Sequence, residues 1–208
     1  ATSWTVFNTV STHADGTATF EIIYYDEHEN PGLSTLSATT DNSLVTIDKT
    51  APTVTASVAS NNATASLAKA DDVVTLNISS DETLYEAPTV TIDGNAQTTN
   101  PTIAASSYSA TRAMEAADTQ GVVAFIISGL KDQAGNTADN VTATNDATSV
   151  TFDSVVPTLT GLTIASSADF DNDNATSLAK SGDVATITFY TSEPSQTPAA
   201  SIATETAT

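Results

Sequence analysis

Residues 45–53 read VTIDKTAPT, and residues 150–158 read VTFDSVVPT, nearly the same nine letters about 105 positions later. Each stretch alternates apolar and polar residues, stops at an aspartate (Asp48 or Asp153) and restarts after a proline. Such alternation predicts a β-strand with one buried face, and proline, which fixes φ and lacks an N–H donor, ends the pairing. The two stretches therefore predict seams, each the end of one β-domain and the start of the next.

The repeat extends outward from both seams. Residues 65–82 match residues 176–193, and the later copy carries an insertion around residues 170–174. Residues 4–30 in turn match residues 108–136. Three notable positions coincide in this second match: Trp4 with Tyr108, Gly16 with Gly121, and Phe20 with Phe125. A self-similarity of this length predicts tandem structural repeats.

The seams divide the chain unevenly. We expect residues 1–50 to be the C-terminal half of a repeat, residues 51–155 a complete repeat, and residues 156–208 the N-terminal half of another. Half a β-domain leaves an apolar sheet face bare and strand edges unpaired. Two explanations stay open. The chain is an internal part of a longer polypeptide, or the partial repeat at the C-terminus of one chain is completed by the partial repeat at the N-terminus of the next chain.

The composition favours strands and turns, because Thr, Ser, Ala, Val and Asp dominate and strong helix formers are scarce. Residues 72–79 and 122–128 alternate with period two, as half-buried strands do. Seven runs between the seams read as strands: 53–59, 72–79, 89–93, 107–114, 122–128, 140–145 and 148–153. The predicted fold is all-β, as tandem immunoglobulin-like antiparallel β-sandwiches. The chain has no cysteine, so no disulfide joins the two sheets.

The charge limits the partners. The chain carries 25 acidic and 5 basic residues, a formal charge of -20, so it has no basic surface with which to bind nucleic acid. The longest apolar run, residues 122–127, is much shorter than the roughly 18 residues of a membrane helix, and we expect no membrane insertion by this segment. Divalent cations would offset the repulsion among so many carboxylates.

The residues that carry enzyme chemistry are scarce. His13 and His28 lie in the first partial repeat and have no counterpart in the second copy. The chain contains no GxSxG or HExxH motif and no phosphate-binding glycine loop. We therefore expect that the protein is not an enzyme.

Four stretches carry a family resemblance: VTIDKTAPTVT, SLAKADDVVTL, APTVTIDGNA and GVVAFIISGLKDQAGN. Together they resemble the bacterial Ig-like repeats that occur in tandem in very large surface proteins and adhesins of Gram-negative bacteria. The resemblance spans essentially the whole chain. It implies an extracellular, cell-surface location and a role as an extender that projects a binding domain. It also implies that calcium stiffens the junctions between repeats.

Several loops offer oxygen ligands of the kind that calcium prefers. Candidate ligands lie at the seams, in the loop after the second strand of the repeat, and in a DxxxN loop that occurs as DEHEN (26–30) and DQAGN (132–136). The predicted ligands are Asp48, Asp153, Asp81, Glu82, Asp132, Asn136, Asp26 and Asn30. The alternative is that these Asp and Asn residues only bond their own backbone in turns.

The insertion adds a further acidic loop. Asp169, Asp171 and Asp173 stand at alternate positions, as at the start of an EF-hand loop. The twelfth position is Lys180, a cation, which excludes an EF-hand. Asp171 and Asp173 remain candidates for an acidic calcium loop of another kind.

The predicted function is a structural extender of an extracellular bacterial surface protein or adhesin, forming a stiff rod in which calcium rigidifies the joints. Its partners would be neighbouring Ig-like repeats or copies of the same chain. An alternative is the subunit of an extracellular filament or sheath, polymerised head to tail through the half-repeats. A carbohydrate- or receptor-binding module is weaker, because only 6% of the residues are aromatic.

Overall fold

The computed structural model describes residues 3–32, 37–167, 178–202 and 205–206. The chain divides into two compact units, Ala1–Ser154 and Val155–Thr208, and the boundary lies at the second seam. Within the described residues every regular element is a strand, so no helix is long and apolar enough to cross a membrane. The strands form several small sheets, which are antiparallel except for one parallel pair.

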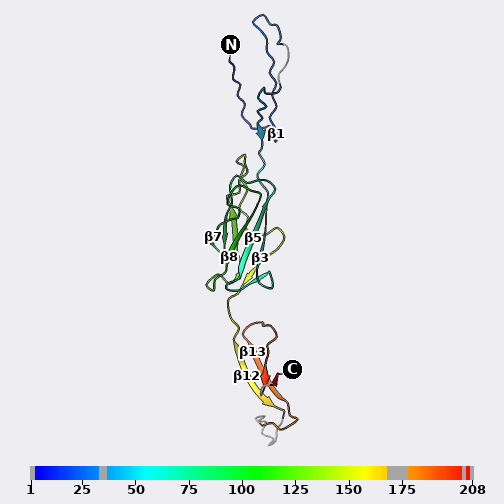
Figure 1. The fold of residues 1–208 in the computed structure, drawn as a ribbon, viewed down its shortest axis with the longest axis vertical. Coiled ribbons are helices and arrows are strands. Elements are labelled where there is room, and N and C mark those ends of the chain that lie inside the picture. The colour runs from blue at the N-terminus through cyan, green and yellow to red at the C-terminus, as the bar shows by residue number, and fades with distance from the viewer. Residues whose placement is uncertain (1–2, 33–36, 168–177, 203–204, 207–208) are drawn as a thin grey trace. The chain divides into compact units, whose positions relative to one another are not determined.

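The largest sheet of the first unit has the order β3-β5-β8, from strands β3 (Val54–Ser60), β5 (Val73–Ser80) and β8 (Ser107–Ala113) (Figure 1). Its antiparallel register sets Leu76 between Val58 and Ala110. Alternate side chains of β3 and β5 are buried, because period-two alternation places their apolar residues on one face. The sheet thus follows directly from the sequence pattern.

Two smaller sheets close the core of this unit. One has the order β10-β6-β7, from β6 (Thr89–Ile92), β7 (Asn95–Gln97) and β10 (Phe125–Ser128). The other has the order β4-β11-β9, from β4 (Leu67–Ala68), β9 (Gly121–Val122) and β11 (Thr151–Phe152), with β11 parallel to β4. The largest fully buried apolar side chains come from all three sheets and their loops: Phe152, Leu76, Leu84, Ile92, Met114, Ile127, Leu130, Val74, Val90 and Val150.

The residues before the first seam form one short sheet, in which β1 (Gly16–Thr17) pairs with β2 (Thr46–Ile47). In the second unit β12 (Leu159–Ser166) pairs with β13 (Ala185–Thr191), with an irregularity between Thr160 and Thr163. Strand β14 (Ser201–Ile202) pairs antiparallel with β15 (Glu205–Thr206). Each of these sheets has two strands.

The strand predictions differ from the structure in several places. The predicted strand 122–128 is divided between β9 and β10, which lie in different sheets, and of the predicted strand 148–153 only β11 is formed. Residues 140–145 contribute one isolated bridge, Val141 to Ile127, and no strand; Ala143, the next residue on the Val141 face of such a strand, is exposed. The short strands β4 and β7 were not predicted, since two or three residues carry no periodicity. Whether the repeats divide at residues 50 and 155 stays a prediction.

Candidate metal centre

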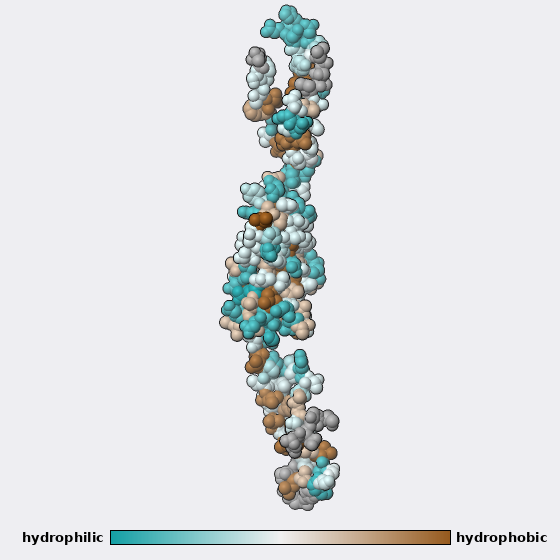
Figure 2. Space-filling model, viewed as in Figure 1, coloured by the Kyte–Doolittle hydropathy of each residue, from teal (hydrophilic) through white to brown (hydrophobic). Residues whose placement is uncertain are grey.

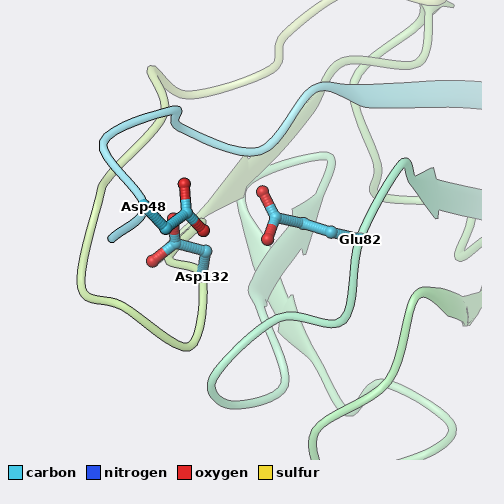
Figure 3. Close-up of side chains that lie close together, drawn as sticks. All are labelled: Asp48, Glu82 and Asp132. Carbon is cyan, nitrogen blue, oxygen red and sulfur yellow. The ribbon is translucent and has the colours of Figure 1, made fainter. Parts of the chain in front are cut away.

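Three carboxylates from distant parts of the first unit converge at the first seam. Asp48 directly follows β2, Glu82 lies in the loop after β5, and Asp132 lies in the loop after β10. One carboxylate oxygen of each residue lies within 4.8 Å of one oxygen of each of the others. Figure 3 shows the side chain of Glu82 pointing toward those of Asp48 and Asp132. This cluster could hold a metal ion.

The loop sequence DQAGN positions Asp132. Asp132 Oδ1 accepts hydrogen bonds from the Gly135 and Asn136 backbone N–H groups at 2.6 and 2.8 Å, and Oδ2 accepts one from Asn136 Nδ2 at 2.7 Å. Gly135 has a φ of 100°, a conformation that glycine adopts readily. Asp132 is fully buried. Burial opposes its ionisation, but the hydrogen bonds from Asn136 and Gly135 outweigh this effect and lower the pKa of Asp132.

Asn136 also binds the seam. Its Nδ2 group donates to the backbone carbonyls of Asp48 at 3.1 Å and Thr50 at 3.4 Å. The same amide therefore orients the Asp132 carboxylate and holds the Asp48 backbone beside it. A partner that fixes a ligand in this way preorganises a metal site.

Glu82 is the residue of the cluster whose pKa is raised. Desolvation raises the pKa of Glu82, and the negative charges of Asp132, Asp48 and Asp81 raise it further. A raised pKa means that the folded protein holds the ionised carboxylate at a free-energy cost. A bound cation would reverse this cost, because it supplies the positive charge that the three carboxylates lack.

Two further predicted carboxylate ligands, Asp81 and Asp153, are not part of this cluster. Asp81 points to the seam instead: its Oδ1 accepts the Thr53 N–H at 2.8 Å, and its own N–H donates to the Thr53 carbonyl at 3.1 Å. Asp153 is exposed, and its N–H donates to the Ala68 carbonyl at 2.9 Å. Among the described residues, the three clustered acids are the only such group. Asp171 and Asp173 lie outside the described residues.

Asp26 and Asn30 form the same loop as Asp132 and Asn136, but without the cluster. Asp26 Oδ1 accepts the Asn30 N–H and Oδ2 accepts Asn30 Nδ2, both at 2.8 Å. The side-chain hydrogen bond from Asn30 is the main reason that the pKa of Asp26 is lowered. In this loop Asp26 and Asn30 form turn hydrogen bonds with each other, as the alternative to calcium binding predicts.

A second set of seam contacts was not predicted. Asp15 Oδ1 accepts the Lys49 N–H at 3.1 Å, and Oδ2 accepts the Thr50 hydroxyl at 2.6 Å. Gln120, at the equivalent position of the next copy, accepts the Ser154 N–H at 3.0 Å. The sequence match could have pointed to these contacts, because Asp15 and Gln120 each directly precede a matched glycine, Gly16 and Gly121.

No protein-family model, curated protein or solved structure matches this chain.

Proposed function

We propose that this chain is a structural extender of an extracellular bacterial surface protein or adhesin, built of tandem Ig-like β-sandwiches. Its role is to hold a binding domain at a distance from the cell surface, and it does not act by catalysis. The observation that carries the proposal is the first seam, which is held from both sides. Asp15 binds it from the preceding segment, and Asn136 and Asp81 bind it from the following one.

The sandwich assignment is supported by the core of the first unit. Inward side chains of β5, such as Leu76, and of β10, such as Ile127, belong to one buried cluster. Their strands lie in different sheets. Two antiparallel sheets that share an apolar core are what a β-sandwich requires.

Calcium is the cation that the clustered acids fit best. The ligand set is entirely carboxylate oxygen, which favours hard divalent cations over zinc or copper. Two oxygens bound to one calcium ion at about 2.3–2.6 Å each lie at most about 5 Å apart, which accommodates the 4.8 Å limit of this cluster. Magnesium is less suitable, since it demands near-ideal octahedral geometry and keeps most of its waters.

Calcium would stiffen the joint by a simple route. Asp48 belongs to the seam, whereas Glu82 and Asp132 belong to loops of the segment that follows it. Without a cation their mutual repulsion favours separation of seam and loops. With a cation the three carboxylates share one ligand, so the seam loses the freedom to bend. Because the unfolded chain has no preformed site, binding also stabilises the fold.

The test is calcium titration by isothermal calorimetry, with thermal unfolding and small-angle scattering in calcium and in chelator. We expect calcium to raise the melting temperature and to narrow the distribution of molecular dimensions. Asp132→Asn should abolish both effects, and Asp26→Asn, in the matched loop without the cluster, should preserve them. If chelation leaves the melting temperature and the dimensions of the wild-type chain unchanged, the calcium joint is wrong.

A further inference from the structure

Two segments that are far apart in the sequence run side by side in the same direction between the seams. One is residues 54–68, which follow the first seam, and the other is residues 145–153, which lead into the second. Four contacting pairs show the shared direction, since the later residue rises with the earlier one: Ala56–Asn145, Val58–Thr148, Leu67–Thr151 and Ala68–Phe152. The entry and the exit of this part of the chain are therefore joined in parallel.

The first part of this parallel pairing covers the open edge of β3. Strand β3 lies at the edge of its sheet, where backbone N–H groups lack a strand partner. The Ala56 N–H donates to Asn145 Oδ1 at 3.0 Å, and the Asn145 N–H donates back to the Ala56 carbonyl at 3.2 Å. The Val58 N–H donates to Thr148 Oγ1 at 3.0 Å. Polar side chains thus take the place of a strand.

The second part anchors β11, which lies between β4 and β9. Two backbone hydrogen bonds join it to the β4 segment, from the Thr151 N–H to the Ser66 carbonyl at 2.8 Å and from the Asp153 N–H to the Ala68 carbonyl at 2.9 Å. Val150 and Phe152 are 0% exposed, and Figure 2 shows mainly hydrophilic and intermediate residues on the visible face of this part of the chain. To slide, β11 must break these bonds and also draw two apolar side chains out of the core.

The two seams leave this part of the first unit at opposite ends. Strand β3 begins at Val54, opposite Ser80, and ends at Ser60, opposite Val74. Residues 145–153 follow the same direction, so they reach the second seam at the end where β3 finishes. Tension along the chain therefore pulls the two parallel segments in opposite directions along their length. Such a pull loads all the hydrogen bonds between them together, whereas a pull across neighbouring strands at one end opens the bonds one at a time.

We propose that this parallel pairing is a load-bearing clamp, by which the protein resists unfolding under tension applied along the chain. The clamp consists of hydrogen bonds and apolar packing, since the chain has no cysteine and no disulfide can carry the load. The inference rests on the proposed function, because an extender carries the tension between a bound target and the cell surface. It does not depend on calcium.

Single-molecule force spectroscopy on the full-length chain in chelator tests the clamp. Handles are attached through pairs of introduced cysteines at exposed positions. The pair Thr53→Cys and Val155→Cys applies tension along the chain. The pair Thr53→Cys and Ser107→Cys pulls β3 and β8 apart at one end of their sheet, because Val54 and Ser107 lie beside Ser80 and Ser79 of β5.

We expect a several-fold higher unfolding force along the chain than across the sheet. Along the chain, unfolding should occur in one step of about 300 Å, the extended length of roughly 100 residues minus the folded distance. A single step is expected because nothing can extend until the clamp has broken.

Thr148 provides a matched pair of variants. Thr148→Val removes the hydroxyl that accepts the Val58 N–H, and Thr148→Ser keeps it. Loss of one such hydrogen bond should make unfolding under along-chain tension about 5-fold faster in Thr148→Val, with Thr148→Ser close to wild type. Gln133→Ala removes a hydrogen bond outside the clamp, from Gln133 Nε2 to the Leu84 carbonyl at 2.9 Å, and should leave this rate unchanged.

Three results would overturn the proposal. One is an equal unfolding force in the two pulling geometries. Another is along-chain unfolding in several short steps at low force, which would mean that β3 or β11 peels away first. The third is the same rate for Thr148→Val and Thr148→Ser, or the same acceleration in Gln133→Ala as in Thr148→Val. None of these results bears on the calcium joint, because the force measurements are made in chelator and the joint is tested by calcium titration.

Discussion

Two matched parts of the first unit, residues 16–32 with 37–48 and residues 121–153, share local pairings and hydrogen bonds but differ in burial. The short sheet at their ends has the same register, since Thr17 pairs with Thr46 as Val122 pairs with Thr151. The DxxxN loops have the same hydrogen bonds from asparagine to aspartate. Yet Asp26 is exposed and Asp132 is fully buried.

The difference lies in what each segment packs against. Strand β10 pairs with β6 and has the apolar cluster of the first unit behind it, whereas Phe20 and Ile22 belong to no strand of the described residues and are 42% and 51% exposed. Local hydrogen bonds therefore come from local sequence, because they recur in both places. Burial, and with it the acidic cluster, is found where the segment pairs with β6 and packs on the apolar cluster of the first unit.

The largest expected effect comes from the buried member of a matched pair. Ile127→Ala should lower the free energy of unfolding of the first unit by about 2–5 kcal/mol, because it removes side-chain atoms from a filled core and leaves a cavity. Ile22→Ala, at the equivalent exposed position, should change it by less than about 0.5 kcal/mol. Urea unfolding at low protein concentration measures both. Equal losses would mean that the N-terminal segment is buried in the isolated chain.

The second effect concerns the two asparagines. Asn136→Ala should weaken calcium binding about 10- to 100-fold, because the amide orients Asp132 and holds the Asp48 backbone. Asn30→Ala removes the same loop bond next to Asp26 and should leave calcium affinity unchanged. Calorimetric titration of each variant with calcium measures the two affinities. A loss of affinity in Asn30→Ala would place calcium in the first loop as well.

Much of the fold could be predicted from the sequence. Alternation located β3, β5 and β8, because seven or eight residues with one buried face leave a clear period of two. The parallel pairing of β11 with β4 could not be predicted, since β4 has two residues and its partner lies more than 80 positions away. Such a contact depends on how the whole first unit packs.

The candidate site was predictable as residue types but not as a group. Asp48, Glu82 and Asp132 were each candidates, together with neighbours that point elsewhere. Asp81 and Glu82 are adjacent, yet Asp81 binds Thr53 and Glu82 reaches Asp132. What selects Glu82 is the bridge between Leu84 and Asp132, a tertiary contact that no local pattern encodes.

The third prediction uses the pH dependence of Glu82. Because its pKa is raised in the folded protein, ionised Glu82 destabilises the metal-free chain, and this cost disappears as the pH falls through that pKa. In chelator near neutral pH, Glu82→Gln should therefore be more stable than wild type. Its advantage should vanish toward pH 4.5, the ordinary value for glutamate. Thermal unfolding across this range measures the difference.

Calcium should reverse the sign of the Glu82 effect. With the ion bound, Glu82 is a ligand, so Glu82→Gln should be less stable than wild type at neutral pH. The pKa of Asp132 is lowered from its ordinary value of 3.8. Ionised Asp132 therefore stabilises the fold above pH 3.8, and this stabilisation is lost only at lower pH, outside the range in which Glu82 titrates. Glu193, the equivalent residue of the second unit, provides the control: Glu193→Gln should show no reversal with calcium. A Glu82→Gln effect with the same sign in calcium and chelator would exclude Glu82 as a ligand.

The smallest effect comes from a turn that the two copies share. Asn42 and Ala147 both have a φ of 59°, and each turn has the same threonine-to-carbonyl bond, from Thr39 to Ser43 at 2.9 Å and from Thr144 to Thr148 at 2.7 Å. Asparagine tolerates this left-handed conformation better than alanine does. Ala147→Asn should therefore stabilise the first unit by about 0.5–1 kcal/mol, as measured by urea unfolding. Asn42→Ala should leave that global unfolding free energy unchanged and only loosen its own turn, since the segment around it is not packed into the core. If both substitutions shifted global unfolding equally, the two copies would be parts of one cooperative unit despite their different burial.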